Sequence, residues 1–335
     1  MDNHAYVLAA RPRGLPEANN WRIVDEPSPE PADGEVLVKT LYLSVDPAMR
    51  GWMDDKPSYL PPVEIGEVMR ALGVGQVVAS KHARFAPGDF VSGMLGVQTF
   101  ACVRSDTLAK IDPNLAPLPK YLSVLGMTGM TAYFGLFKIG EAKAGDTVVI
   151  SAASGAVGSI AGQIAKIAGC RTIGIAGGAE KCAYLRDELG FDAAIDYRSE
   201  NMYGALREHC PSGINVYFDN VGGDILDACL VNLAMHARVV VCGAISQYNN
   251  EQGTRGPSNY MMLLVKRSRM EGFLVSDYYA EYGNAAREMA GWLRDGKLRS
   301  HEEVVEGIDR FPETLLRLFT GEHLGKLVIE VTKPD

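Results

Sequence analysis

One short stretch constrains the fold of this chain more than any other. Residues 148–150 form an apolar run typical of a buried strand, residues 151–154 form a turn of small side chains, and a helix pattern follows over 156–168. Gly155 in such a turn lets the backbone approach a ligand closely, and Gly158 lets the helix pack tightly on the strand. A strand, a tight turn and a helix in this order predict a parallel α/β sheet.

Strand and helix patterns alternate beyond residue 126. Apolar strands are predicted at 147–152, 172–176, 215–218, 238–242 and 269–275, and helices at 131–137, 156–168, 180–189 and 225–232. This alternation is typical of a doubly wound parallel sheet that is covered on both faces by helices. We therefore expect a domain of this kind over residues 126–299.

The first third of the chain has a different character. Alternating patterns predict strands at 35–45, 74–80 and 89–91, and nine of the 17 prolines precede residue 63. Strand-like residues return at 328–331, after a short amphipathic helix at 315–319. We therefore predict a β-rich domain over 1–125 that is completed by residues 300–335.

Composition excludes several classes of protein. The net charge is −8, which disfavours generic nucleic-acid binding. The uncharged run 147–165 approaches the length of a membrane span, but its many serines and glycines fit a strand and a buried helix better. The N-terminus lacks the apolar core of a signal peptide. We expect a cytoplasmic protein that binds neither membrane nor nucleic acid.

The six cysteines are scattered along the chain. None has the spacing of a zinc site, and no metal site is predicted. Their even number leaves disulfides possible, but a long chain with irregular spacing favours free thiols.

The turn at 151–158 predicts a dinucleotide site, because phosphates bind at the N-terminus of a helix that follows such a loop. An NAD site has a carboxylate at the tip of the second strand, but residues 176–179 read Ala-Gly-Gly-Ala. Lys181 stands close by and favours a 2′-phosphate. The sequence therefore predicts NADPH rather than NADH.

Several motifs together resemble one known family. They are Tyr-Leu-Ser-Val-Asp-Pro-Ala-Met-Arg at 42–50, Gly-Met-Thr-Gly-Met-Thr-Ala-Tyr at 126–133, the loop at 152–158, Phe-Asp-Asn-Val-Gly-Gly at 218–223, Cys-Gly-Ala-Ile-Ser-Gln-Tyr at 242–248, Arg-Met-Glu-Gly-Phe at 269–273 and Leu-Gly-Lys at 324–326. This set resembles the zinc-free medium-chain dehydrogenase/reductase group of leukotriene hydroxydehydrogenase/prostaglandin reductase and alkenal double-bond reductases. The resemblance covers essentially the whole chain.

The resemblance implies a fold and an activity. The fold is a GroES-like β-rich catalytic domain with a Rossmann domain inserted, and relatives are typically homodimers. The implied reaction is the NADPH-dependent reduction of the C=C bond of a small apolar α,β-unsaturated ketone or aldehyde, by hydride transfer to the β carbon without zinc. A quinone reductase and a non-enzymatic NADPH-binding protein are the alternatives.

The resemblance also implies site residues. The cofactor residues are Gly155, Ala156, Val157 and Gly158 at the pyrophosphate, Lys181 and Tyr197 at the 2′-phosphate, and Asn220, Cys242, Gly243, Ala244, Ile245, Ser246, Tyr248, Phe273, Leu274, Val275 and His323 along the adenosine and nicotinamide. Substrate residues are Trp52, Tyr59, Met127, Tyr248 and Tyr260.

The chain departs from the family pattern at two positions. Val265 replaces a tyrosine that relatives often carry near the substrate carbonyl, and His323 replaces a common asparagine. With Val265 in place, a cofactor hydroxyl and bound water are the favoured donors, and Tyr260, Tyr59 and Tyr248 are the candidate side chains, with Tyr260 and Tyr59 as the catalytic candidates.

Overall fold

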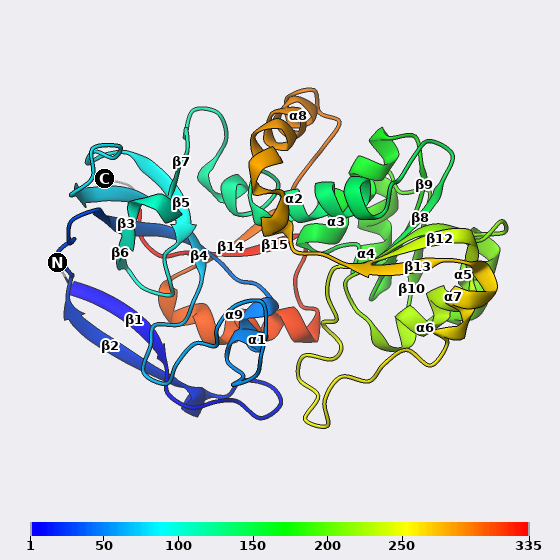
Figure 1. Ribbon diagram of the computed structural model, residues 1–335, viewed down its shortest axis with the longest axis horizontal. Helices are drawn as coiled ribbons and strands as arrows, with labels where there is room; N and C mark the ends of the chain where they lie inside the picture. Colours follow the sequence, from blue (N-terminus) through cyan, green and yellow to red (C-terminus); the bar gives the residue numbers. More distant parts are fainter. Residues whose placement is uncertain (1, 334–335) are drawn as a thin grey trace. The chain divides into compact units, whose positions relative to one another are not determined.

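The computed structural model describes residues 2–333 and divides the chain into two compact units (Figure 1). Unit 1 comprises residues 1–122 and 302–335, and unit 2 comprises residues 123–301. Unit 1 is thus built from both ends of the chain, with unit 2 inserted between them. The expected fold class, a β-rich domain and a doubly wound parallel-sheet domain, is confirmed.

Unit 1 is a β structure. An antiparallel pair is formed by β1 (Asp2–Leu8) and β2 (Trp21–Pro27). A seven-stranded sheet has the order β14-β15-β3-β4-β5-β7, with β6 paired to β3. Its strands are β3 (Glu35–Ser44), β4 (Leu72–Ser80), β5 (Phe90–Met94), β6 (Phe100–Arg104), β7 (Ala109–Lys110), β14 (Glu302–Glu306) and β15 (Lys326–Glu330). Two helices, α1 (Ala48–Trp52) and α9 (Phe311–Thr320), belong to this unit.

A buried ion pair ties β15 of unit 1 to the start of α1. The Lys326 ammonium lies 3.1 Å from Asp46 Oδ1 and donates to the carbonyl oxygen of Val45 at 2.5 Å. Ser44 Oγ donates to the other oxygen of the same carboxylate. Burial lowers the pKa of Lys326, against the attraction of Asp46. Because a lone buried charge is costly, this pair fixes the loop that leads into α1.

Unit 2 is a six-stranded, all-parallel sheet with the strand order β10-β9-β8-β11-β12-β13. The strands are β8 (Thr147–Ser151), β9 (Arg171–Ala176), β10 (Ala193–Asp196), β11 (Ile214–Asp219), β12 (Leu233–Val241) and β13 (Arg269–Gly272). The chain enters this sheet at β8 and adds β9 and β10 outward on one side of it. It then crosses back and adds β11, β12 and β13 outward on the other side. The order therefore reverses between β8 and β11, where α/β proteins bind ligands.

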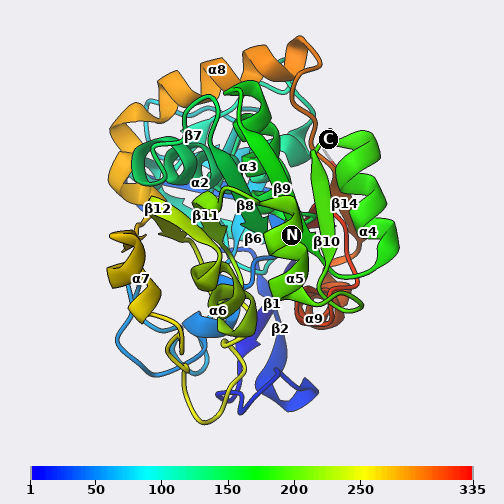
Figure 2. The same cartoon turned by 90° about the vertical axis from the view of Figure 1, so that its right-hand side faces the viewer.

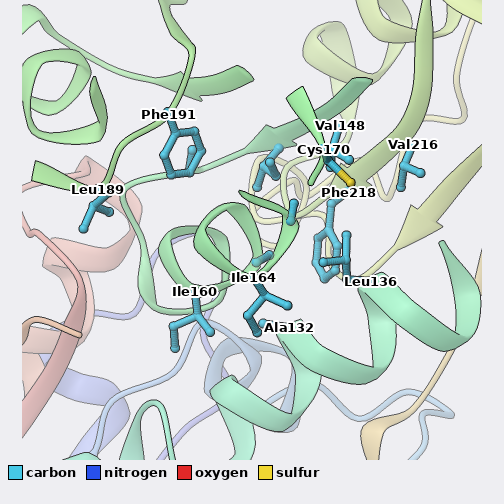
Figure 3. Close-up of a cluster of buried hydrophobic side chains, with 14 of the residues drawn as sticks. Ala132, Leu136, Val148, Ile160, Ile164, Cys170, Leu189, Phe191, Val216 and Phe218 are labelled. Atoms are coloured by element: carbon cyan, nitrogen blue, oxygen red, sulfur yellow. The ribbon is translucent and has the colours of Figure 1, made fainter. Parts of the chain in front are cut away.

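Both faces of this sheet are covered by helices (Figure 2). The helices are α2 (Met127–Phe134), α3 (Ala156–Ile167), α4 (Ala179–Ala183), α5 (Met202–His209), α6 (Gly223–Val231), α7 (Met261–Lys266) and α8 (Tyr282–Arg294). Alternate residues of β8 point to opposite faces of the sheet. Val148 and Ile150 pack in the core on the face with α2 and α3, whereas Val149 packs in the core on the face with α5 and α6. Figure 3 shows the first of these cores, where Ile160 and Ile164 of α3 lie close to Ala132 of α2.

Several expected elements have different bounds. The helix expected over 131–137 is α2 followed by a π-helical turn, Gly135–Ile139, and the strand expected over 238–242 begins earlier, at Leu233. The strand expected over 269–275 ends at Gly272, because Phe273 leaves the sheet edge to pack into the core against Gly135. The helix expected over 180–189 is α4 followed by a π-helical turn, Tyr184–Glu188.

The six cysteines all lie in the described part of the chain and are free thiols, as predicted. No helix within residues 2–333 is both long enough and apolar enough to span a membrane.

Candidate functional site

The turn after β8 is shaped by close backbone packing. Ala152 adopts a φ of 46°, and its carbonyl oxygen accepts a hydrogen bond from Gly155 N at 3.0 Å. A Cβ atom on Gly158 would lie 2.4 Å from that same oxygen, which is closer than any side chain tolerates. Only glycine at position 158 therefore lets α3 approach the turn this closely.

This packing aims the N-terminus of α3 at the carboxyl edge of the sheet. The first hydrogen bond that closes the helix runs from Ser159 N to Gly155 O, at 3.0 Å. The N–H groups of residues 156–158 precede it and have no partner within the helix. No acidic residue stands in the first turn of α3 to compete for them. The loop and the helix end thus fit a diphosphate.

The strands on either side of the switch point are joined by Asn220. Its backbone N–H donates to Ser151 Oγ at 2.9 Å, and its side-chain amide donates to the Ser151 carbonyl oxygen at 2.8 Å. Asn220 is therefore held in one orientation at the crevice between β8 and β11.

Asp219 is a buried acceptor beneath this crevice. Its Oδ1 accepts from Tyr217 OH (2.8 Å), Ser151 Oγ (3.2 Å) and the N–H groups of Val221 (3.0 Å) and Gly222 (2.9 Å). Burial raises the pKa of Asp219, although these donors favour the charged form. The carboxyl group therefore connects the end of β8 to the turn into α6.

The loop after β12 is attached to the loop after β11. Cys242 N donates to Asp219 O at 2.9 Å, and Ile245 N donates to Asn220 O at 3.2 Å. The hydroxyl of Tyr248 accepts from Ala244 N at 3.1 Å. Burial raises the pKa of the Cys242 thiol to about 12, so Cys242 remains a neutral thiol. The predicted cofactor residues of these two loops therefore lie together.

The predicted 2′-phosphate residues also share an edge. Tyr197 follows β10, donates its N–H to Ala176 O at 3.1 Å, and has an exposed ring. Lys181 lies on α4, half-buried, just beyond the tip of β9. The parallel pairing of β9 with β10 brings both residues to this edge.

The predicted cofactor residues after β13 are divided. Phe273 and Val275 pack on the hydrophobic core beside α2, whereas Leu274 is 38 % exposed. Met127 begins α2 and is half-buried, and Tyr260 directly precedes α7 with 57 % of its surface exposed.

Three predicted site residues belong to unit 1. Trp52 is buried, and its Nε1 donates to the hydroxyl of Tyr59 at 3.3 Å. Tyr59 is 54 % exposed and stands on the loop 55–62, which lines an open depression of about 400 Å³. His323 is half-buried, with its Nδ1 3.3 Å from the Arg317 carbonyl oxygen.

Comparison with known proteins identifies the family. Residues 4–111 match the family model described as the N-terminal domain of oxidoreductase, and residues 156–291 match the model described as zinc-binding dehydrogenase. The chain is 42 % identical to the NADPH-dependent curcumin reductase of Escherichia coli, over 99 % of this chain and 98 % of that one. It is 41 % identical to a 2-alkenal reductase (NADP(+)-dependent) of Nicotiana tabacum, over 99 % and 98 % of the two chains.

This chain is an NADP-dependent oxidoreductase of the medium-chain dehydrogenase/reductase family. Within it, the chain belongs to the group that contains the alkenal and curcumin reductases. The structure of CurA from Vibrio vulnificus in complex with NADPH has a TM-score of 0.94, with 43 % identity over 99 % of this chain and 100 % of that one. Between residues 2 and 333, no group of three or more histidine, cysteine or acidic side chains is arranged to hold a metal.

Two residues of the site were not found from the sequence. Ser151 and Asp219 lie beneath the loops and hold them by hydrogen bonds. Asp219 lies inside a motif that the sequence does show, but nothing in that motif indicates that its side chain turns inward.

Proposed function

We propose that this chain reduces the C=C bond of small apolar α,β-unsaturated ketones and aldehydes with NADPH. The observation that carries this proposal is the identity of about two residues in five to a 2-alkenal reductase over 99 % of the chain. The Gly155–Gly158 turn and the Ala-Gly-Gly-Ala sequence at 176–179, where β9 ends, support it, because they fit the diphosphate and the 2′-phosphate of the cofactor.

Each part of the chain has a task in this reaction. When bound, NADPH supplies the hydride. The helix N-terminus at residues 156–158 binds the diphosphate, and Lys181 with Tyr197 binds the 2′-phosphate. Asn220 and the loop 242–248 line the cofactor beyond the diphosphate.

A second task falls on hydrogen-bond donors at the substrate. Negative charge develops on the carbonyl oxygen as the β carbon is reduced, so a donor placed there stabilises the transition state. The α carbon then needs a proton. We propose Tyr260 or Tyr59 for these steps, because both phenols are exposed. Met127 and Tyr248 supply apolar surface for the substrate, whereas Trp52 is buried and acts only by holding the Tyr59 hydroxyl.

The decisive experiment measures NADPH oxidation with a long-chain enal, an aryl enone and a quinone, and identifies each product. We expect saturated aldehyde or ketone from the first two, with the carbonyl intact. Turnover of the quinone alone would instead make the chain a quinone reductase. Tight NADPH binding without any turnover would favour the non-enzymatic alternative. Tyr260→Phe and Tyr59→Phe, assayed on the best substrate, then show which phenol contributes.

We further propose that two copies of the chain pair through β13. This strand is the edge of the six-stranded sheet, and all four of its residues are exposed. Met270 on the strand is an exposed apolar side chain, and so are Leu264 and Val265 just before it. In an antiparallel pair centred on Met270, Arg269 of each copy would face Glu271 of the other. Proteins normally cover or block an exposed edge strand of this kind. The pairing of Arg269 with Glu271 across the two-fold axis makes a second copy of this chain the favoured cover.

Met270→Glu tests this interface. Two carboxylates would then meet at the two-fold axis, and like charges placed together cost several kcal/mol, so the dimer dissociation constant should rise by at least about 100-fold. Size-exclusion chromatography with light scattering gives the mass. Met235→Glu, at another exposed methionine of unit 2, is the matched control and should leave the dimer intact. A monomeric wild-type protein, or a Met270→Glu dimer of unchanged affinity, would contradict the proposal.

The free thiols are consistent with a reducing compartment. We accordingly propose that the protein works in the cytoplasm.

A further inference from the structure

The tip of β9 has a second cationic side chain beside the two residues already assigned to the 2′-phosphate. Strand β9 ends at Ala176, and Gly177 and Gly178 follow it. A Cβ atom on Gly177 would lie 2.9 Å from the hydroxyl of Tyr197 and 2.9 Å from Nε of Arg198. Both side chains therefore lie directly against the backbone of the strand tip, which only the absence of a side chain at Gly177 permits.

The space beyond this tip is open. A Cβ atom on Gly178 would have no heavy atom within 4 Å. The Arg198 guanidinium is exposed and lies 5.9 Å from the centre of the Tyr197 ring. A planar guanidinium in this position has the donor geometry that phosphate groups bind best.

The Asp196 carboxylate at this tip is held by hydrogen bonds within the fold. Asp196 Oδ1 accepts from the N–H of Gly178 at 2.8 Å and of Arg198 at 3.0 Å, while Oδ2 accepts from Ser199 Oγ at 2.8 Å. These bonds, first among them the one from Gly178, lower the pKa of Asp196, so it is ionised at neutral pH. The carboxylate thus holds the turn that presents Arg198 and is committed to backbone groups, rather than to the ribose hydroxyls that NAD would offer.

We propose that Arg198 binds the 2′-phosphate of the cofactor and, with Gly177, sets the preference for NADPH over NADH. The proposal builds on the NADP dependence of this chain and on the proposed roles of Lys181 and Tyr197, and it adds a residue that selects the cofactor. Lys181 supplies a point charge, whereas Arg198 supplies a fork of donors that requires the extra phosphate. NADH lacks that phosphate and has no group for Arg198 to bind.

The test compares two soluble fragments of the cofactors on the intact protein. Adenosine 2′,5′-bisphosphate and adenosine 5′-monophosphate are titrated by calorimetry into the wild type, Arg198→Ala, Arg198→Lys and the control Arg186→Ala, which removes an exposed arginine of the same unit. We expect Arg198→Ala to weaken the bisphosphate by about 10- to 100-fold and to leave the monophosphate unchanged. Arg198→Lys should fall in between, and Arg186→Ala should match the wild type.

Two results on the variants would overturn the proposal. Equal loss for both ligands would mean that Arg198 supports the fold of the turn, and no loss for either would mean that other groups bind the phosphate. A wild type that does not distinguish the two ligands would overturn the use of NADPH as well, and it would be seen before any variant is made. Gly177→Ala gives an independent check, because its Cβ must displace Tyr197 and Arg198 and should lower the bisphosphate affinity selectively.

Discussion

Replacing Gly158 by alanine is expected to weaken NADPH binding by about 10- to 100-fold and to destabilise unit 2 by about 1–3 kcal/mol. The added Cβ would lie 2.4 Å from the Ala152 carbonyl oxygen and 2.8 Å from the Ala153 Cα. Both neighbours are backbone atoms, so no side-chain rotation relieves the clash. The turn and the start of α3 must separate, and the N–H groups of residues 156–158 then lose their position. Thermal unfolding and a fluorescence titration with NADPH measure the two effects.

Two other glycines separate the causes of these effects. Gly155→Ala places a Cβ 3.2 Å from Ala152 O and near no other atom of the protein. Stability should therefore change little, and any loss of NADPH affinity would report a close approach of the cofactor to Gly155. Gly291→Ala, inside α8 where a Cβ meets nothing within 4 Å, should leave NADPH binding unchanged and raise stability slightly. Normal NADPH affinity and stability in Gly158→Ala would refute the assigned role of this turn.

The order of strands and helices in unit 2 could be predicted because each of these elements has a clear local pattern in the sequence. The segments at 147–152, 172–176, 215–218 and 238–242 are each dominated by apolar residues, and each contributes a strand to the observed sheet. Such runs are what a strand buried on both faces requires. The alternation of strands with helices then restricts the topology, because parallel neighbours need crossover connections.

The elements that escaped prediction have weak local signals. Strand β10 has only four residues. Helix α8 is the exception, because Tyr282, Ala285, Met289 and Trp292 repeat at helical spacing and contact the core, so its pattern was present and was missed. Strand β14 reads Glu-Glu-Val-Val-Glu, which lacks the usual alternation. The β1–β2 pair is joined by a long connection in place of a short turn, so no local signal marks it. Each of these forms through packing or pairing with distant residues.

The candidate site shows the same division. Gly155 and Gly158 could be recognised because the mechanism of phosphate binding requires small residues at that spacing. Arg198 could not, since its position depends on the pairing of β9 with β10, and β10 itself was not predicted. The roles of Ser151 and Asp219 likewise depend on which strands are neighbours. Residues that contact a ligand are thus easier to predict from sequence patterns than residues that hold those contacts in place.

Asp219→Ala is expected to lower the free energy of unfolding by about 3–5 kcal/mol, near the upper end for a single substitution. Its Oδ1 accepts from two hydroxyls and two backbone N–H groups, and all four lose that acceptor together. Ser151 Oγ can turn to the Phe218 carbonyl oxygen at 3.4 Å, but the N–H groups of Val221 and Gly222 cannot move without moving the loop. Asn220 and the loop 242–248 should then loosen, so NADPH affinity should fall as well. Chemical denaturation and NADPH titration measure both effects.

Asp219→Asn is the matched variant, because it keeps an oxygen acceptor at Oδ1 and removes the charge. It should lower the free energy of unfolding much less than Asp219→Ala does. It should also change how the free energy of unfolding depends on pH, in the direction that the raised pKa of Asp219 dictates. Burial raises the pKa of Asp219 in the folded protein, so the folded state binds more protons than the unfolded state between the usual pKa and the raised one. The contribution of this group to stability is therefore present at low pH and is lost as pH rises through that window. Asp219→Asn removes that loss, so its stability deficit relative to the wild type should shrink as pH rises above the usual pKa of an aspartate. A deficit that grows with pH, or an alanine variant as stable as the asparagine variant, would show that the carboxyl oxygen does not hold the two loops together.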